Sequence, residues 1–240
     1  MTQKFNHPSY KVLITGTAGT GKTTLFEKLV RAEKAQWKFV FDHQGEFAGR
    51  FRVPSVTNID DLEDKTFRKG WVVYDPADDF PGKSADGFVF FCEYVFITCK
   101  EVRGRKLFCC DELQALTDQH NAPEALLTVC ETGRRHQIDG FFISQAPNRI
   151  HNSVRNQLTD VYTFRQSDAN AIKYLVDNGF NEDEVRNLKQ YEAIHRNLRT
   201  GQVMYSKGRG FSAENTSRSG PRGQEIPPDE SGSGDAVAAR

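Results

Sequence analysis

The feature that most constrains this chain is the run GTAGTGKT at residues 16–23. It fits the phosphate-loop pattern G-x-x-x-x-G-K-[ST], in which backbone N–H groups cradle phosphate oxygens. An apolar run of strand character at residues 12–15 leads into it, and residues 24–30 continue with apolar side chains at helical spacing. The order strand, loop, helix predicts an α/β domain that holds a nucleoside triphosphate at the N-terminus of a helix.

The pattern gives the residues of this loop separate roles. Lys22 is expected to reach the β- and γ-phosphates, and the Thr23 hydroxyl to help hold Mg²⁺. The glycines permit the tight turn and let the backbone approach the ligand. An ordinary glycine-rich turn is the alternative, but it does not account for the strand and helix on either side. The predicted ATP-binding set is Gly16, Thr17, Ala18, Gly19, Thr20, Gly21, Lys22, Thr23 and Thr24.

Composition narrows the choice of partners and surroundings. The chain has 240 residues, with 32 Lys and Arg against 32 Asp and Glu, so any contact with nucleic acid has to come from local patches. The 5 cysteines include no C-x-x-C pair, which disfavours a zinc site and favours buried thiols in a reducing compartment. No run of 18 apolar residues and no signal-peptide pattern occurs, so we expect a soluble, intracellular protein without a transmembrane segment.

Strand and helix patterns alternate from Lys11 to about Lys207. Such alternation predicts a mostly parallel central sheet flanked by helices. Strands are expected at residues 12–15, 37–41, 71–75, 106–110, 140–144, 161–165 and 193–198, and helices at 87–100, 123–135 and 168–176. The phenylalanines of 87–100 would also suit a strand. We therefore assign one ATPase domain to residues 1–207 and a disordered tail rich in Gly, Ser and Pro to residues 208–240.

Two acids, Asp111 and Glu112, follow the apolar strand at residues 106–110. Downstream of a phosphate loop, Asp111 is expected to hold Mg²⁺ through its water shell. Glu112 is expected to orient and activate the water that attacks the γ-phosphate. The alternative is a plain helix cap, in which an Asp accepts backbone N–H bonds. The catalytic interpretation predicts an ATP hydrolase, whereas a kinase has to keep water away from the phosphoryl group.

Two further positions complete the predicted catalytic set. Gln145 ends the strand at residues 140–144, beside the acidic strand, where it could contact the γ-phosphate and report hydrolysis. A turn residue before Pro147 is the other interpretation. Arg134 and Arg135 close the helix predicted at residues 123–135 and could offer an arginine finger to a neighbouring subunit's nucleotide. A basic helix end that complements the helix dipole is the simpler account of these arginines.

Taken together, these motifs resemble the FtsK/HerA superfamily of hexameric DNA-pumping ATPases. The residues that carry the resemblance lie within about 11–165: the phosphate loop; Asp42, Gly45, Glu46 and Phe47; Asp111 and Glu112; the Gly-Arg pair in 132–136; and the strand ending Ser144-Gln145. A compact chain with the ATPase core and few additions is similar to the genome-packaging ATPases of tailless, membrane-containing viruses. The resemblance implies a RecA-like phosphate-loop fold, ATP and Mg²⁺ as cofactors, and a ring of six subunits that pumps DNA into a preformed capsid.

The same resemblance implies partners and location. Contacts to the DNA backbone would make translocation independent of sequence. Docking on a capsid vertex or a viral membrane protein would place the chain in the host cytoplasm or at the virion vertex. Loops carrying Lys83, or Arg103 and Arg105, are candidates for gripping DNA, although both could be ordinary solvated loops.

Three other functions remain open from sequence. Zot-like assembly proteins of filamentous phages share the arginine–strand–Gln region but usually carry a transmembrane helix. A nucleotide kinase would share the phosphate loop. A nucleotide-gated structural protein of a virion vertex would hydrolyse little ATP, but such degenerate sites usually lose Lys22, Thr23, Asp111 or Glu112, and this chain keeps all of them.

Overall fold

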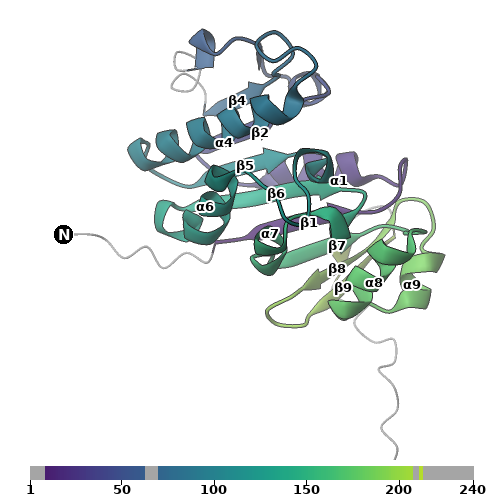
Figure 1. The fold of residues 1–240 in the computed structure, drawn as a ribbon. Coiled ribbons are helices and arrows are strands. Elements are labelled where there is room, and N and C mark those ends of the chain that lie inside the picture. Colours follow the sequence, from purple (N-terminus) through teal and green to yellow (C-terminus); the bar gives the residue numbers. More distant parts are fainter. Residues whose placement is uncertain (1–8, 63–69, 208–210, 213–240) are drawn as a thin grey trace, which may run out of the picture.

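The computed structural model describes residues 9–62, 70–207 and 211–212. Within them the chain forms one ten-stranded sheet with helices on both faces (Figure 1). The strand order is β10-β9-β8-β7-β1-β6-β5-β2-β4-β3. The strand that leads into the phosphate loop therefore lies near the middle of the sheet.

Seven neighbouring strands run parallel and the last three run antiparallel. The parallel strands are β1 (Lys11–Thr15), β2 (Trp37–Phe41), β3 (Ser55–Val56), β4 (Trp71–Tyr74), β5 (Lys106–Cys110), β6 (Ile138–Ser144) and β7 (Asp160–Thr163). The antiparallel strands are β8 (Glu192–Asn197), β9 (Val203–Lys207) and β10 (Phe211–Ser212). Because the parallel strands all end at one edge, we call that edge the carboxyl edge and the opposite one the amino edge.

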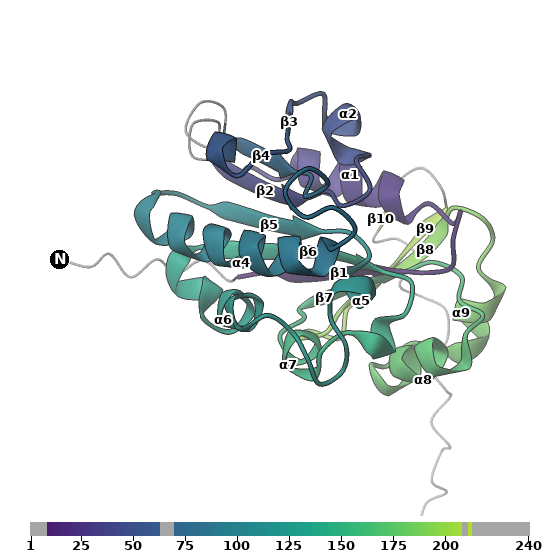
Figure 2. The same cartoon turned by 45° about the horizontal axis from the view of Figure 1, so that its top comes forward.

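Helices divide unequally between the two faces of the sheet, as Figure 2 shows. One face carries α1 (Lys22–Ala32) and α2 (Phe47–Phe51). The other carries α4 (Ser84–Glu101), α5 (Leu113–Leu116), α6 (Glu124–Thr132), α7 (Asn152–Asn156), α8 (Ala169–Asp177) and α9 (Glu182–Asn187). Short 3₁₀ turns lie at Gly133–His136 (η1) and Pro147–Arg149 (η2).

Alternation along the buried strands supplies both layers of the core. In β5, Phe108 packs toward α4, while its neighbours Leu107 and Cys109 pack toward α1. Successive strand side chains point to opposite faces, so an all-apolar strand is required where both faces are covered. On α4, Phe88 and Phe91 lie within about 6 Å of the Phe108 ring, measured between ring centroids at 6.3 and 6.1 Å.

The predicted fold class is confirmed, and most differences concern the ends of elements. The phenylalanine-rich segment at 87–100 is a helix. The helix predicted at 123–135 ends at Thr132, and the chain continues as the η1 turn. The short elements α2, α5, α7, α9, β3 and β9 were not predicted from the sequence.

The predicted tail lies outside the described residues except for Phe211–Ser212, which pair with β9 beyond the expected domain end. Across the described ranges, no helix combines the length and apolar character needed to cross a bilayer.

Candidate nucleotide site

The carboxyl edge of the sheet gathers the residues that the sequence marked for phosphate chemistry. The phosphate loop follows β1, the acids follow β5, and Gln145 follows β6. Because β6 lies between β1 and β5, Gln145 lies between the phosphate loop and the acids. Ligands of open parallel sheets bind at this edge, so the position agrees with a nucleotide site.

Close packing around the phosphate loop explains its glycines. Gly16 has φ +147°, and a Cβ atom there would come within 2.7 Å of the Phe164 Cβ. At Gly19, which has φ +73°, a Cβ would meet no atom within 4 Å. The first glycine is therefore required by packing, whereas the second is required by its backbone conformation and faces open space.

Hydrogen bonds from the loop's own residues fix its shape. The Thr20 hydroxyl donates to the Thr17 carbonyl oxygen at 2.7 Å. The Thr17 backbone N–H donates to the Arg165 carbonyl oxygen at 3.0 Å, which ties the loop to the segment after β7. Ala18 at the tip is exposed.

Lys22 begins α1, and its side chain folds back over the loop. Its Nζ donates to the Thr17 carbonyl oxygen at 2.9 Å, and the residue is only 7% exposed. Burial lowers the Lys22 pKa, while the charges of Glu112 and Asp111 act against this shift. An ammonium group partly removed from water next to a loop of N–H donors is well placed to bind phosphate.

The first turn of α1 offers further donors. The helix has Gly21 at its N-cap, and no side chain caps its first turn. Thr23 is half-buried and Thr24 exposed in that turn. An uncapped helix N-terminus favours an anion through its unsatisfied N–H groups and its dipole.

Asp111 is buried, and its environment suits a cation. Burial raises the pKa of the Asp111 carboxyl to about 6, and the Glu112 charge adds to the shift, whereas the Glu112 backbone N–H and Lys22 oppose it. That N–H donates to the carboxylate at 2.7 Å. A divalent cation would return the carboxyl to its charged form. The Asp111 carboxylate and the Thr23 hydroxyl are both oxygen ligands of the kind that Mg²⁺ prefers.

Glu112 occupies an unusual backbone conformation and is held by two amides. Its φ of +48° lies in the left-handed region, which costs a non-glycine residue about 1–2 kcal/mol. Gln145 Nε2 donates to Glu112 Oε1 at 2.7 Å, and Gln114 Nε2 donates to Oε2. The predicted base and the predicted reporter are thus in direct contact.

Sequence reasoning missed two glutamines of this site. Gln114 lies in α5, two positions beyond Glu112, and that proximity was the only available signal. Gln166 is buried and donates from Nε2 to Thr15 Oγ1 at 2.9 Å and to the Gln145 carbonyl oxygen at 3.2 Å. It links the ends of β1, β6 and β7.

The Asp42 motif that carried part of the family resemblance has a structural role in this chain. Its carboxylate accepts backbone N–H bonds from Glu46 at 2.9 Å, Phe47 at 2.7 Å and Ala48 at 3.1 Å, at the start of α2. Next to it, His43 is half-buried, and burial lowers its pKa while the charges of Glu112, Asp42 and Asp75 oppose the shift.

Arg134 and Arg135 are not brought to this site within the chain. Both are exposed in the η1 turn, which immediately precedes β6 and therefore lies at the amino edge. Within one subunit they lie at the opposite edge of the sheet from the phosphate loop.

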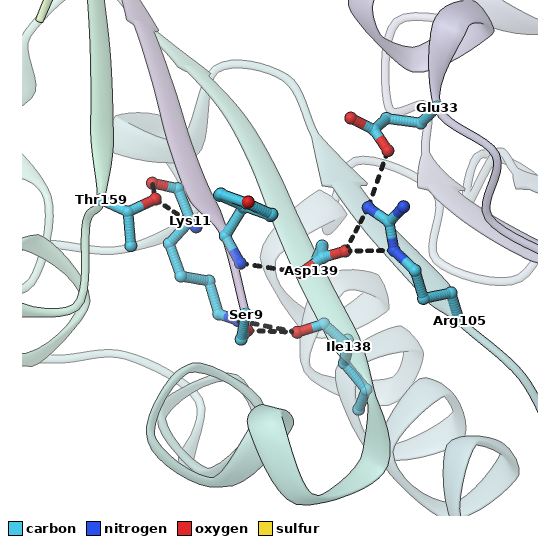
Figure 3. A network of polar contacts seen from close by, with 8 residues as sticks. Ser9, Lys11, Glu33, Arg105, Ile138, Asp139 and Thr159 are labelled. Atoms are coloured by element: carbon cyan, nitrogen blue, oxygen red, sulfur yellow. Dashed lines mark hydrogen bonds and ion pairs between the residues drawn. The ribbon is translucent and has the colours of Figure 1, made fainter. Parts of the chain in front are cut away.

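Arg105 lies in a polar network at the amino edge, shown in Figure 3. Its guanidinium contacts the carboxylates of Asp139 and Glu33, each at 2.7 Å. Asp139 also accepts the Tyr10 backbone N–H at 2.8 Å, and nearby Lys11 donates from Nζ to the Ile138 carbonyl oxygen at 2.8 Å. The suggestion that Arg105 grips DNA is therefore replaced by a structural role; Arg103 and Lys83 are exposed.

All five cysteines are buried as free thiols. Burial raises the pKa of Cys99 to about 12 and that of Cys130 to about 11, so these thiols stay protonated. In the part of the chain that the structure describes, no group of three His, Cys, Asp or Glu side chains is arranged to hold a metal ion. A magnesium ion in this site would therefore depend on phosphate oxygens and water for most of its ligands.

Comparison with known proteins supports the fold. A family model described as the type IV secretion-system coupling protein DNA-binding domain matches residues 4–65. No curated protein matches the chain.

Solved structures match over most of the chain. The genome packaging NTPase B204 from Sulfolobus turreted icosahedral virus 2, in complex with ATP-gammaS, matches with TM-score 0.67 and 18% identity, over 85% of this chain and 98% of that one. VirB4 of Thermoanaerobacter pseudethanolicus matches with TM-score 0.57 and 12% identity, over 82% and 88%. At these identities the likeness is one of fold. The phosphate-loop NTPase fold and the resemblance to FtsK/HerA-type ATPases are confirmed.

Proposed function

We propose that the chain is an ATP-driven DNA translocase, and specifically a genome-packaging ATPase that works as a ring at a capsid vertex. The observation that supports ATP hydrolysis is the position of the Glu112 carboxylate. It lies at the carboxyl edge of the sheet, as the phosphate loop does, and two side-chain amides donate to it. A carboxylate fixed in this way is suited to orient and deprotonate water.

The residues of the site divide the reaction among them. Lys22 and the backbone N–H groups of the phosphate loop hold the β- and γ-phosphates and balance their growing charge. Glu112 orients the attacking water and takes its proton. Thr23 and Asp111 would hold Mg²⁺, which supplies further charge neutralisation on the phosphates when bound. Gln145 donates to Glu112, the proposed general base, so its side chain can respond when the γ-phosphate is lost.

Arg134 and Arg135 complete the site only if a second subunit supplies them. An exposed arginine pair at the amino edge cannot reach the nucleotide of its own chain, but it can reach a neighbour's nucleotide in a ring. An arginine finger offered in this way would neutralise transition-state charge. We infer a hexamer from the family resemblance.

Support for the DNA-pumping part comes from relatives, not from a DNA site in this chain. The family model that matches residues 4–65 describes a DNA-binding domain, and B204 is described as a genome packaging NTPase that spans nearly the same length. We propose that DNA backbone contacts come from exposed basic loops, with Lys83 and Arg103 as the remaining candidates.

The test is ATP hydrolysis by the purified protein, alone and with double- or single-stranded DNA, with Glu112→Gln as the matched blank. We expect turnover that rises with DNA and falls about 10²–10⁴-fold in the variant, because the general base is lost. Turnover indifferent to both DNA and Glu112 would contradict the translocase proposal. Hydrolysis that requires an acceptor molecule instead would identify a kinase.

A further inference from the structure

A cavity of about 270 Å³ opens next to the phosphate loop, on the face of the sheet that α1 covers. Gly21 and Thr24 line it at the loop end, and Leu25 and Leu29 line it along α1. Its opposite wall is formed by Phe164 after β7, Tyr191 before β8 and Ala193 in β8. We call this cavity the α1–β8 slot.

The position of the acids decides which end of a triphosphate points toward the slot. Asp111 and Glu112 follow β5 and Gln145 follows β6, on one side of β1. The γ-phosphate has to lie on that side, next to the water that Glu112 would activate. The slot lies on the other side of β1, toward β7 and β8. A nucleotide with its γ-phosphate at Glu112 therefore extends its α-phosphate and nucleoside toward the slot.

Tyr191 is placed to contact the part of a bound nucleotide that extends from the phosphate loop toward the slot. The residue is 56% exposed although its ring lies against the loop: a Cβ on Gly21 would meet Tyr191 Cδ1 at 3.1 Å. Its backbone has φ +65°, an uncommon conformation for a residue with a large side chain. An exposed aromatic ring held by strained backbone next to a binding loop is a feature that functional sites retain.

We propose that the α1–β8 slot takes the nucleobase of the bound triphosphate, with the Tyr191 ring stacked on the base. This inference rests on the proposed function, because the acids set the direction of the nucleotide. Most of the slot is lined by apolar side chains, and its polar side chains come from Thr24, Lys28 and Ser206. Thr24 and Lys28 are exposed, so Ser206 is the one among them that burial fixes.

The Tyr191 ring can stack on any base, but a slot with few polar side chains makes few hydrogen bonds to the edge of the base. Strong discrimination needs fixed polar groups that are left unpaired by the wrong ligand, and Ser206 is the one such buried group among Thr24, Lys28 and Ser206. We therefore expect ATP and GTP to bind with similar affinity, and pyrimidine nucleotides to bind more weakly because a single ring stacks over less area.

The experiment compares nucleotides with inorganic tripolyphosphate, which has the phosphates but no base. Dissociation constants for ATP, GTP, UTP and tripolyphosphate are measured by calorimetry in magnesium buffer for the wild type, Tyr191→Ala and Tyr191→Phe. Tyr191→Ala should weaken ATP about 5- to 100-fold, the effect of losing one base–aromatic contact, and leave tripolyphosphate unchanged. Tyr191→Phe should bind ATP as the wild type does. Tyr10→Ala, which removes a 36% exposed ring just before β1 at the amino edge, is the matched control.

A second variant guards against misfolding of Tyr191→Ala. Tyr191→Trp keeps a stacking ring and adds a fluorophore, and we expect ATP but not tripolyphosphate to change its emission. Equal weakening of ATP and tripolyphosphate by Tyr191→Ala, or no weakening of either, would overturn the slot. So would an emission of Tyr191→Trp that ignores ATP.

These results also separate the slot from the function it rests on. Base-dependent binding without any hydrolysis would keep the slot and remove the translocase. DNA-stimulated hydrolysis that needs Glu112, together with a Tyr191→Ala variant of normal ATP affinity, would keep the translocase and remove the slot. A wild type that binds neither ATP nor tripolyphosphate would overturn both.

Discussion

The Glu112 carboxylate lies between two side-chain amides, and this arrangement carries the catalytic argument at the scale of single residues. Gln145 donates to one oxygen and Gln114 to the other. With both oxygens engaged, the carboxylate has little freedom to rotate, so under the proposed function its orientation toward an attacking water would be set before the substrate binds. Fixed orientation of this kind is a large part of what an active site contributes to rate.

Removing either amide should slow hydrolysis without weakening nucleotide binding. We expect Gln114→Ala and Gln145→Ala each to lower kcat about 10- to 100-fold, the usual effect of losing a hydrogen bond to a charged group. The KM for ATP should stay near that of the wild type, because neither amide contacts the phosphate loop.

Gln119→Ala is the control for these variants, since its amide donates to the Asn148 carbonyl oxygen at 2.8 Å and not to Glu112. A rise in KM with an unchanged kcat in either test variant would show that the amides bind substrate instead of positioning Glu112.

At the scale of elements, the two edges of the sheet have different tasks. The carboxyl edge gathers the phosphate loop, the acids and the glutamines, whereas the amino edge is closed by buried polar contacts (Figure 3). There the Arg105 guanidinium ties β5 to Asp139 in β6 and to Glu33 after α1. The Asp139 side chain is 2% exposed, so these partners replace the water that its carboxylate loses on burial.

Arg105→Ala should therefore destabilise the fold. We expect a loss of about 1–3 kcal/mol in the free energy of unfolding, because a buried carboxylate loses a charged partner. Arg103→Ala is the control: Arg103 is exposed, and its backbone carbonyl, which accepts the Trp37 Nε1–H bond at 3.0 Å, is kept. Urea denaturation measures both. Normal stability of Arg105→Ala combined with a weaker response of ATP hydrolysis to DNA would instead restore Arg105 as a DNA contact.

A second buried carboxylate, Asp160, joins β7 to β8. It accepts hydrogen bonds from His195 Nε2 at 2.9 Å, Thr159 Oγ1 at 2.7 Å and Asn197 Nδ2 at 3.0 Å. Burial acts to raise the Asp160 pKa, but the His195 hydrogen bond and charge and the other two bonds outweigh it, and the pKa is lowered overall. A lowered pKa in the folded state means that the carboxylate stabilises the fold at neutral pH.

Stability should therefore depend on Asp160 in a pH-dependent way. We expect Asp160→Asn to lose about 1–3 kcal/mol at pH 7. The stabilisation is present above the unfolded-state pKa of about 3.9 and is lost as pH falls through the lower folded-state value, so the difference between the variant and the wild type should begin to shrink below about pH 4 and keep shrinking as pH falls further.

Thermal unfolding from pH 7 down to pH 3 follows this difference. Asp177→Asn, which alters an exposed pair with Lys173, is the control and should show no such trend. A constant gap between Asp160→Asn and the wild type at every pH would show that the side chain acts through packing alone.

At the scale of the whole molecule, Arg134 and Arg135 can act as the proposed arginine finger only in an assembly, because they lie away from the phosphate loop of their own chain. The two groups lie at opposite edges of one sheet, so a shared active site requires that the amino edge of one subunit meet the carboxyl edge of the next. A head-to-tail arrangement of this kind closes into a ring when its rotation allows.

Loss of the arginine finger should abolish turnover but not binding. We expect Arg134→Ala or Arg135→Ala to lower the hydrolysis rate about 10³–10⁵-fold while the dissociation constant for ATP stays unchanged. Mixing the inactive arginine variant with Lys22→Ala subunits should restore part of the activity, because each variant supplies what the other lacks at a mixed interface. Full activity in both arginine variants, or in a monomer at high dilution, is incompatible with a shared site.

Sequence alone determined the parts of this protein that depend on neighbouring positions. The phosphate loop and the Asp111-Glu112 pair are runs of adjacent residues, so they can be recognised in the sequence. The alternation of strand and helix patterns along the chain was enough to predict the α/β class. The strand that ends in Gln145 was found for the same reason. Element ends were less certain, as at η1, because capping and 3₁₀ turns compete over small energy differences.

The tertiary structure decided which distant residues meet. Gln145 reaches Glu112 across 33 positions because β6 and β5 are neighbours in the sheet. Arg105 reaches Glu33 across 72 positions because α1, which ends just before Glu33, packs on one face of the sheet. Tyr191 lies at the phosphate loop only because β8 returns antiparallel to β7, next to the strand that carries the loop. A sequence pattern records the period of each element but not its neighbours in the sheet. The contacts between strand ends therefore followed from packing the whole chain.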